Sequence, residues 1–413
     1  MVGVDVARAL ALLAMMATHL VPETADDGRQ TLTGVLFAGR ASALFAVLAG
    51  VSLALATGGE RPRVDAGARA GVAVRALLVA AVGLLLVEPR PADRGDPHEL
   101  RAAVPRGPPL LRLRPRALLV TGGCWAVLTP LLSHALRSGR AAGPGAQPSL
   151  RDVGTDPLSL LERLLLTGYY PVLTWTTFLL VGLAVGRVAL HRADVARRLV
   201  ALGAGAAAVA WGASTLLVRA GWTHLVAAGP GADVQPSLGP GRLRLRGLYG
   251  TTPTTSPWWL AVVAPHTGTP FDLVHVAGCA VAVLGLCLLL TGRLQRPGRR
   301  GAGVGAARAL AATGSMTLTL YTLHVIAADA GWGPDEPHTL WLLHAALAVL
   351  LAALWRSWAP RGPLEQVVAE PVRGRALRRP PPRRRVAVDH VRSVCGRLTR
   401  VRHLAKRPCT YCT

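Results

Sequence analysis

Three ionisable residues, Asp5, Arg8 and His19, interrupt an apolar stretch at the start of the chain. A carboxylate, a guanidinium and an imidazole can move protons or bind charged groups, but each is costly in hydrocarbon unless it has a partner or faces a wet cavity. On a helix, Arg8 and His19 share nearly one face, and Asp5 is only modestly offset. Asp5 and Arg8 have the i, i+3 spacing of an ion pair, while His19 lies about 21 Å beyond Asp5 along the helix axis. The alternatives are an ion pair that only orients the helix and a histidine at a membrane interface.

Other polar side chains are expected at the level of His19, near the ends of later apolar stretches. They are five histidines, one arginine and two carboxylates: Arg40, Glu88, His134, His266, Asp272, His275, His324 and His344. Imidazoles with a guanidinium and carboxylates at one membrane level indicate an acid–base site. Histidine also binds metals, but no HExxH or comparable ligand spacing is present, so we predict no metal.

The elements that would position these residues are membrane helices. The chain has 413 residues, of which 51% are hydrophobic, and several apolar stretches approach the length that crosses a bilayer. We therefore predict an all-α, polytopic transmembrane helical bundle with nine apolar helices. The stretches lie at 3–21, 34–57, 70–88, 116–136, 170–190, 198–219, 272–291, 308–330 and 339–358.

The charges predict how this bundle is oriented. The net charge is +24, and we interpret this excess as a mark of cytoplasmic loops, with no nucleic acid as partner. Arginines concentrate in the links 58–69, 187–198 and 292–308, whereas acidic residues lie in 22–33 and 331–338. This pattern places both termini in the cytoplasm of a protein that is integral to the cell membrane.

Nine helices cannot satisfy all of these loops, because every basic link after the third helix would fall outside. One more crossing between residues 89 and 111 repairs the pattern, but the segment 89–110 is polar and rich in proline. We interpret 89–110 as an aberrant, frameshifted segment, so that ten helices are expected for the intact chain. The alternative is a genuine hydrophilic loop, and the nucleotide sequence distinguishes the two. The predicted domains are a membrane domain over 1–358 and a basic, largely disordered cytoplasmic tail over 359–413.

Several segments resemble a known family. The stretch "GVDVARALALLAMMATH" (3–19) is similar to the first helix of the transmembrane acyltransferase superfamily, in which an Asp is followed by an Arg and then by a His. Asp5, Arg8 and His19 match that pattern. Five further segments resemble bacterial proteins like heparan-alpha-glucosaminide N-acetyltransferase: "GRASALFAVLAGVSLAL" (39–55), "GLYGTTP" (247–253), "PHTGTPFD" (265–272), "MTLTLYTLH" (316–324) and "RGPLEQVV" (361–368). The resemblance covers about 3–88 and 111–370, and its break coincides with the aberrant segment.

The resemblance implies acyl transfer across the membrane. The donor would be cytoplasmic acetyl-CoA or another acyl-CoA, and the acceptor an extracytoplasmic glycan, lipid or amine. His19 would be the catalytic base or a transient acyl carrier, with Arg8 and Asp5 on the donor side. The residues expected to bind substrate on the acceptor side are Arg40, His266, Asp272 and His324. The lysosomal member carries its catalytic histidine in a longer loop after the first helix, and nothing here clearly matches that loop.

Other interpretations remain open from the sequence. A multi-pass transporter could use the outer histidines as a proton or substrate site, and an inactive frameshifted family member would have lost one helix. The Gly-rich segment 301–308 could hold the phosphates of coenzyme A or could be a flexible linker. Membrane lipid is an expected partner, and the oligomeric state is not predicted.

Overall fold

The structure, a computed structural model, describes residues 1–25, 29–62, 109–138, 154–227, 252–296, 298 and 301–368. Three predictions concern residues outside these ranges: the apolar stretch 70–88, its last residue Glu88, and the segment 89–110. Of that segment, only residues 109 and 110 are described. Of the predicted tail, residues 359–368 are described, and 363–368 are helical.

The described residues form helices and connecting segments, with an isolated antiparallel pairing between Thr24 and Gln30. The all-α prediction is therefore confirmed for this part of the chain. The α-helices are α1 (Val2–Leu20), α2 (Leu32–Leu36), α3 (Arg40–Ala56), α5 (Pro115–Arg137), α7 (Pro157–Glu162), α8 (Val172–Val185), α9 (Ala193–Ala220), α10 (Trp222–Ala227), α12 (Pro270–Leu294), α13 (Ala302–Gly314), α14 (Thr317–Asp329) and α15 (Pro337–Trp358). Shorter turns are η1 (Pro109–Arg112), the π-helical η2 (Arg163–Thr167) and η4 (Pro257–Ala261).

Six stretches among the described residues are long and apolar enough to cross a membrane. They are Val2–Leu20, Leu32–Ala56, Pro115–Arg137, Ala193–Ala220, Pro270–Leu294 and Pro337–Trp358. Two bent pairs, α7 and η2 with α8 (49°) and α13 with α14 (76°), raise the number to eight if each pair is one span. The chain is thus an integral membrane protein, and the counts of nine and ten helices stay predictions.

The stretch 308–330 differs from the single helix expected there. It is divided between α13 and α14, which meet at the 76° bend. The Gly-rich segment 301–308 is not a loop, because it forms the first turns of α13 after Gly301. The bend turns α14 away from α13 and carries His324 toward the end of α1.

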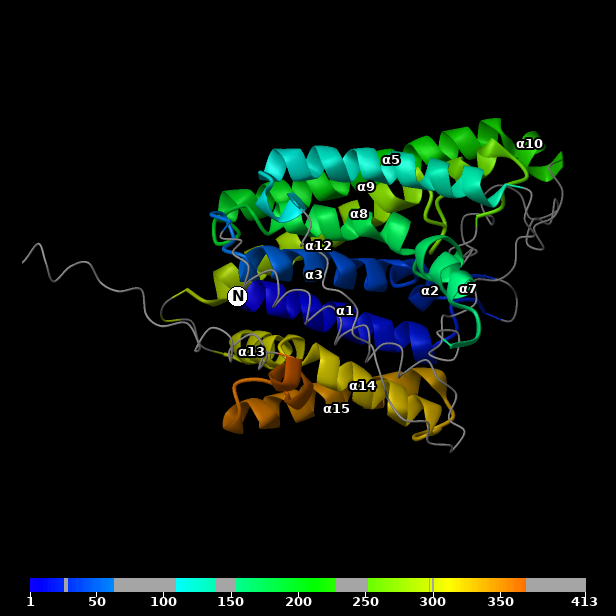
Figure 1. The fold of residues 1–413 in the computed structure, drawn as a ribbon. Coiled ribbons are helices and arrows are strands. Elements are labelled where there is room, and N and C mark those ends of the chain that lie inside the picture. The colour runs from blue at the N-terminus through cyan, green and yellow to red at the C-terminus, as the bar shows by residue number, and fades with distance from the viewer. Residues whose placement is uncertain are drawn as a thin grey trace, which may run out of the picture.

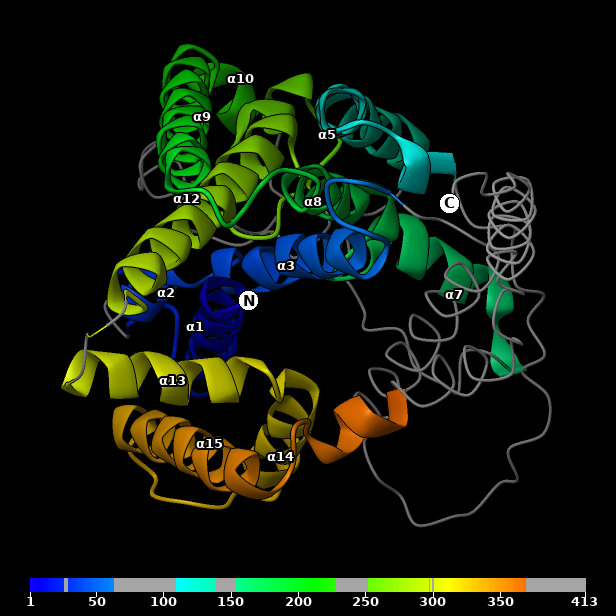
Figure 2. The ribbon, with the colours of Figure 1, turned by 90° about the vertical axis from the view of Figure 1, so that its left-hand side faces the viewer.

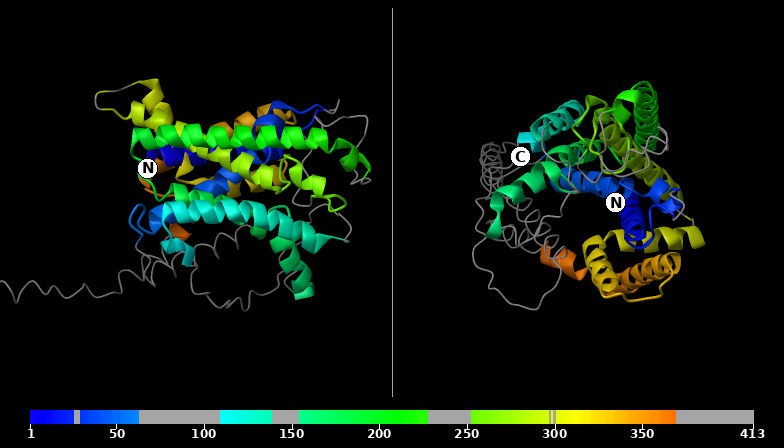
Figure 3. Two further views of the ribbon diagram at one scale, coloured as in Figure 1. Left: turned by 90° about the horizontal axis from the view of Figure 1, so that it is seen from above. Right: turned by 90° about the vertical axis from the view of Figure 1, so that its right-hand side faces the viewer.

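Helix α1 lies between two groups of helices (Figures 1 and 2). The first group is α3, α5, α8, α9 and α12, and the second is α13, α14 and α15; the end-on view in Figure 3 shows the same division. Val4, Ala7 and Ala11 of α1 belong to the hydrophobic cluster of the first group. Leu12 and Met16 belong to the cluster of the second group. Both groups are therefore built around α1.

Small residues bring several helix backbones into close contact. A Cβ atom added at Gly203 of α9 would lie 2.7 Å from the carbonyl oxygen of Gly278 on α12. A Cβ atom added at Gly182 of α8 would lie 2.0 Å from the carbonyl oxygen of Val47 on α3. Such approaches are typical of membrane helices, where packing and not the hydrophobic effect drives association. These contacts fix how α3, α8, α9 and α12 are arranged.

The bundle has two ends, which we name the Arg8 end and the His19 end. The N-terminus and Arg8 lie at the first, and the last turn of α1 with His19 lies at the second, near α2 (Figure 1). At the Arg8 end, the buried guanidinium of Arg187 follows α8 and donates to the carbonyl oxygens of Ala54, Thr57, Gly59 and Leu111. This arginine therefore closes the last turn of α3.

Candidate functional site

At the Arg8 end, the ion pair predicted from the sequence forms within α1. Nη1 of Arg8 donates to Oδ1 of Asp5 at 2.8 Å, and the N-terminal ammonium lies 3.4 Å from Oδ2 of the same carboxylate. Nη2 of Arg8 donates to the hydroxyl of Ser52 on α3. Both side chains are partly exposed, at 24% and 21%. Arg8 is thus held in place by groups on two helices while part of its guanidinium remains accessible.

At the His19 end, three histidines from three helices form a continuous series of contacts. Nδ1 of His19 lies 3.3 Å from Nε2 of His324, and Nδ1 of His324 lies 2.9 Å from Nδ1 of His344. Nε2 of His344 in turn lies 3.4 Å from the carbonyl oxygen of Trp332. His324 and His344 are buried, with 4% and 5% of their surfaces exposed, whereas His19 is exposed. The series therefore begins at an accessible imidazole and runs into the protein; we call it the histidine series.

Arg40 contacts a different histidine, His275, which is not part of the histidine series. Its Nη2 lies 3.2 Å from Nε2 of His275 on α12, and its Nη1 donates to the carbonyl oxygen of Val35 at 2.7 Å. Nδ1 of His275 is 2.9 Å from the carbonyl oxygen of Ala207 on α9. A carbonyl only accepts, so Nδ1 of His275 carries the proton and Nε2 accepts from Arg40. Arg40 thereby joins α3 to α12 and α9 at the His19 end.

Asp272 closes the start of α12. The hydroxyl of Thr269 accepts from the backbone N–H of Asp272 at 3.1 Å, and Oδ2 of Asp272 accepts from the N–H of Gly268 at 3.1 Å. The first bond caps α12 at Thr269, and the second holds the residue before the cap. Asp272 is 4% exposed. The carboxylate therefore shapes the loop before α12, and its role toward a substrate stays a prediction.

His266 lies in that loop, enclosed by aromatic rings. Its ring centroid is 4.7 Å from that of Tyr169, 5.4 Å from that of Tyr170 and 6.1 Å from that of Trp175, with the last ring nearly parallel. Its backbone has φ of 60°, a value that only a few non-glycine residue types adopt readily. Burial lowers the pKa of His266 to about 4, so the ring is neutral at neutral pH.

Tyr170 belongs to this aromatic group, and sequence reasoning did not single it out. Its ring centroid lies 4.6 Å from that of Trp175, and its phenol is within electrostatic range of Glu23 and Tyr321. The ring of Tyr321 on α14 is 5.8 Å from that of His19. Burial raises the pKa of Glu23, which lies in the connection after α1. The only signal in the sequence is the pair of tyrosines before Pro171, at the start of α8.

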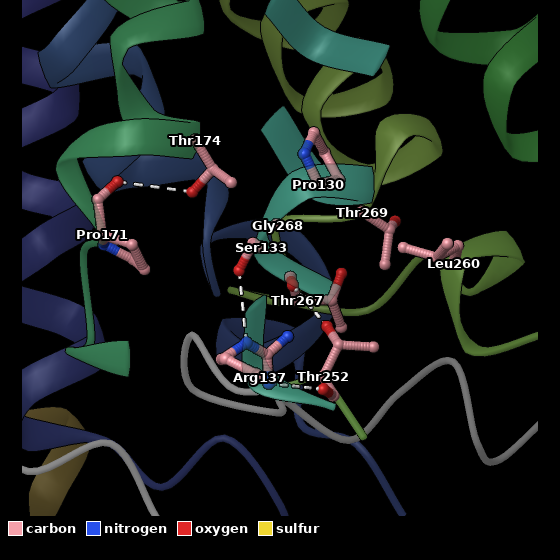
Figure 4. Close-up of a pocket in the computed structure, with 10 residues that line it drawn as sticks. All are labelled: Pro130, Ser133, Arg137, Pro171, Thr174, Thr252, Leu260, Thr267, Gly268 and Thr269. Carbon is pink, nitrogen blue, oxygen red and sulfur yellow. Dashed lines mark hydrogen bonds between the residues drawn. The ribbon is translucent and has the colours of Figure 1, made fainter. Parts of the chain in front are cut away.

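Among the described residues, His134 on α5 is not brought to the histidine series; it lies within electrostatic range of Arg137 on the same helix. Arg137 is buried and also lines a small polar pocket beside the loop before α12, where Nη1 donates to the carbonyl oxygen of Thr252 at 2.7 Å (Figure 4). The pocket has room for roughly one water molecule. It is too small for an acyl acceptor.

The site residues named from the sequence therefore fall into three arrangements. Asp5 and Arg8 pair at the Arg8 end, His19 joins His324 and His344, and Arg40, His266 and Asp272 surround the start of α12. Within the described ranges, no group of three or more His, Cys, Asp or Glu side chains is arranged to hold a metal ion. The arrangement offers imidazoles, a guanidinium and hydroxyls, which suit proton transfer and the binding of polar groups.

Comparison with protein families supplies an independent finding. The model described as "Heparan-alpha-glucosaminide N-acetyltransferase, catalytic" matches residues 1–219, which is more than half of the 413 residues. Comparisons with curated proteins and with solved structures found no match. The matched region contains Asp5, Arg8, His19 and Arg40, and the remaining site residues lie beyond it. The chain therefore belongs to the family of heparan-alpha-glucosaminide N-acetyltransferases, a family of membrane acetyltransferases.

Proposed function

We propose that the chain is an acyltransferase of the cell membrane, which moves an acetyl or acyl group from cytoplasmic acyl-CoA to an extracytoplasmic glycan, lipid or amine. The observation that carries the proposal is the state of His19, an exposed imidazole at one end of a helix that presents Arg8 at the other. Its Nδ1 is engaged by His324, and none of the described residues hydrogen-bonds its Nε2. Membership of an acetyltransferase family supports acyl transfer as the chemistry.

The reaction needs one proton acceptor at the acyl group. The amine or hydroxyl of the acceptor attacks the thioester carbonyl, the new bond to the acyl carbon forms, and the carbon–sulfur bond breaks with coenzyme A leaving as its thiolate. The proton of the attacking group passes to Nε2 of His19, acting as general base. If His19 is instead a transient acyl carrier, the same Nε2 attacks the thioester first and then delivers the acyl group. Both routes require Nε2 to be unprotonated.

The proposal assigns binding of acyl-CoA to the Arg8 end of the bundle and binding of the acceptor to the His19 end. Arg8, paired with Asp5, lies at the end proposed to face the cytoplasm with both termini, where it would meet the anionic acyl-CoA. Arg40, His266, Asp272 and His324 lie at the acceptor end. His324 contacts His19 directly, Arg40 would bind the acceptor from α3, and His266 and Asp272 would act by holding the loop before α12. No metal is required in this scheme.

The test uses membranes that contain the full chain and acetyl-CoA labelled in its acetyl group. Labelled product in the glycan, lipid or amine fraction and release of free coenzyme A are measured together. The variant His19→Ala should lose both, while His338→Ala, an exposed histidine at the start of α15, should retain both. Full activity of His19→Ala with normal membrane insertion would reject the assignment of His19.

One observation favours a second function, a proton-coupled transporter. Three histidines in contact within a membrane bundle can also serve a proton pathway. Proteoliposomes that contain the chain would then show substrate uptake driven by a pH gradient, without turnover of acyl-CoA. If the well-folded wild-type chain shows neither activity, the interpretation as an inactive frameshifted family member is favoured.

A further inference from the structure

The hydrogen-bond pattern of the histidine series determines where its protons lie. The series ends at a main-chain carbonyl, because Nε2 of His344 is 3.4 Å from the oxygen of Trp332. A carbonyl oxygen accepts and never donates, so the proton of a neutral His344 is on Nε2. Its Nδ1 then carries a lone pair and can only accept.

The proton position on His344 determines the position on His324, which in turn determines that on His19. Nδ1 of His324 is 2.9 Å from Nδ1 of His344, which carries a lone pair. Nδ1 of His324 must therefore carry the proton and donate it. Nε2 of His324 is therefore an acceptor, and it faces Nδ1 of His19 at 3.3 Å. Nδ1 of His19 must then carry the proton, which leaves Nε2 of His19 with its lone pair.

The assignment holds only if the three rings are neutral, and their surroundings favour this state. In the part of the chain that the structure describes, no carboxylate hydrogen-bonds any of the three imidazoles. With the bond to Trp332 kept, the opposite direction of donation would require a charged His344 that donates to Trp332 from Nε2 and to His324 from Nδ1. That cation would lie on a side chain only 5% exposed, beside the imidazole of His324 and within a membrane bundle. Such a charge without a counter-ion is strongly disfavoured.

We propose that His344, aligned by the carbonyl of Trp332, acts through His324 to hold His19 in the tautomer with its proton on Nδ1. This inference rests on the proposed function in one respect, namely that the free lone pair on Nε2 is the base or nucleophile of acyl transfer. His344 and Trp332 are positioning groups, since neither touches the reacting atoms. The series also accommodates exactly one added proton, on Nε2 of His19, without breaking any of its three hydrogen bonds.

The direct test reads the tautomer and does not depend on activity. The full chain, with ¹⁵N- and ¹³C-labelled histidine, is placed in lipid bilayers and its imidazole nitrogens are observed by solid-state NMR. The signals of His19 are assigned by their loss in His19→Gln, because the chain contains 12 histidines. We expect a protonated Nδ1 and an unprotonated Nε2 on His19. In His344→Phe, which keeps a ring but offers no acceptor, we expect the proton of His19 to be shared between both nitrogens.

A kinetic test separates positioning from a merely structural role. His344→Phe should lower kcat about twofold or more with KM unchanged, because sharing of the proton lowers the fraction of His19 with a free Nε2. His344→Asn should restore part of kcat, because its amide oxygen can accept from Nδ1 of His324. His338→Phe is the matched control and should leave kcat and KM unchanged.

The outcomes are separable. A protonated Nε2 on His19 in the wild-type chain, or a tautomer unaffected by His344→Phe, overturns the inference whatever the activity. If the expected tautomer is found but the wild-type chain transfers no acyl group, the positioning by His344 stands and the proposed function falls. Equal loss of kcat in the Phe and Asn variants, with the tautomer retained in both, would also overturn the role of His344.

Discussion

The guanidinium of Arg40 lies with its Nη2 3.2 Å from Nε2 of His275, and so connects the first turn of α3 to α12. The same guanidinium holds the carbonyl of Val35 with Nη1, while the carbonyl of Ala207 orients the imidazole from the other side. One arginine thus aligns three helices at the end of the bundle where the acceptor is proposed to bind.

The substitution Arg40→Lys should weaken this junction. A lysine has one nitrogen and no planar fork, so it can replace only one of the two hydrogen bonds. We expect a loss of about 1–2 kcal/mol of unfolding free energy, measured by denaturation in detergent, while Arg219→Lys at an exposed position changes it little. If Arg40 also binds the acceptor, KM for the acceptor rises at temperatures where the variant is fully folded. An unchanged KM would remove Arg40 from the acceptor site.

The substitution Arg187→Met should lower the unfolding free energy more than is usual for a residue that lies just after a helix. Arg187 is only 3% exposed and donates to four carbonyl oxygens and the hydroxyl of Thr57. A methionine fills similar space but leaves these acceptors without a donor, so a loss of about 3 kcal/mol or more is expected. Arg198→Met, at an exposed arginine in the first turns of α9, is the control. Equal stability of the two variants would contradict the capping role of Arg187.

The close contact between α9 and α12 predicts that glycine-to-alanine substitutions at two positions of α9 have different effects on stability. In Gly203→Ala the new methyl meets Ala282 N and Gly278 O at 2.7 Å, and backbone cannot move aside as a flexible side chain would. We expect a loss of about 1–3 kcal/mol. In Gly205→Ala the methyl meets nothing within 4 Å, and alanine is the better helix former. Melting temperatures in the same detergent should fall for the first variant and stay equal or rise for the second.

His266 predicts a pH dependence of stability. Its pKa is about 4 in the folded chain and about 6.5 when unfolded, so between these values the unfolded chain binds more protons. Stability should therefore fall as the pH falls from about 6.5 to 4, by as much as about 3 kcal/mol. His266→Asn, whose side chain tolerates the positive φ, lacks this contribution and should show a flatter curve. Identical pH slopes for the two proteins would refute the neutral, enclosed state of His266.

The part of the site that lies within one helix could be predicted from the sequence, because helical periodicity alone determines it. The pairing of Asp5 with Arg8 follows from their spacing, and the apolar stretch 3–21 closely matches α1. Hydropathy also locates the ends of apolar stretches and so predicted His324 near the level of His19, and Nε2 of His324 lies 3.3 Å from Nδ1 of His19. Contact between His19 and His324 could not follow, because it depends on the bend between α13 and α14.

Other features depend on contacts that no local pattern contains. Arg187 was counted as a charge of a cytoplasmic loop, yet its guanidinium is buried against the end of α3 because the connection after α8 folds back onto that helix. His266 is predicted from the sequence to bind substrate on the acceptor side, and the structure shows its ring enclosed by aromatic residues before and within α8. Both cases require the packing of α8, whose position is set by the close approach of Gly182 to α3.

The hydrogen bonds of α1 connect its two halves to different partners. Arg8 donates to Ser52 in the first group of helices, whereas His19 and the carbonyl of Leu13 bond to His324 and Trp341 in the second. If the second group rocks or slides against the first, α1 must follow one of them and give up its bonds to the other, or else bend. The separation between the Arg8 end and the His19 end is therefore set by a single helix, whose hydrogen bonds connect each of its ends to a different group of helices.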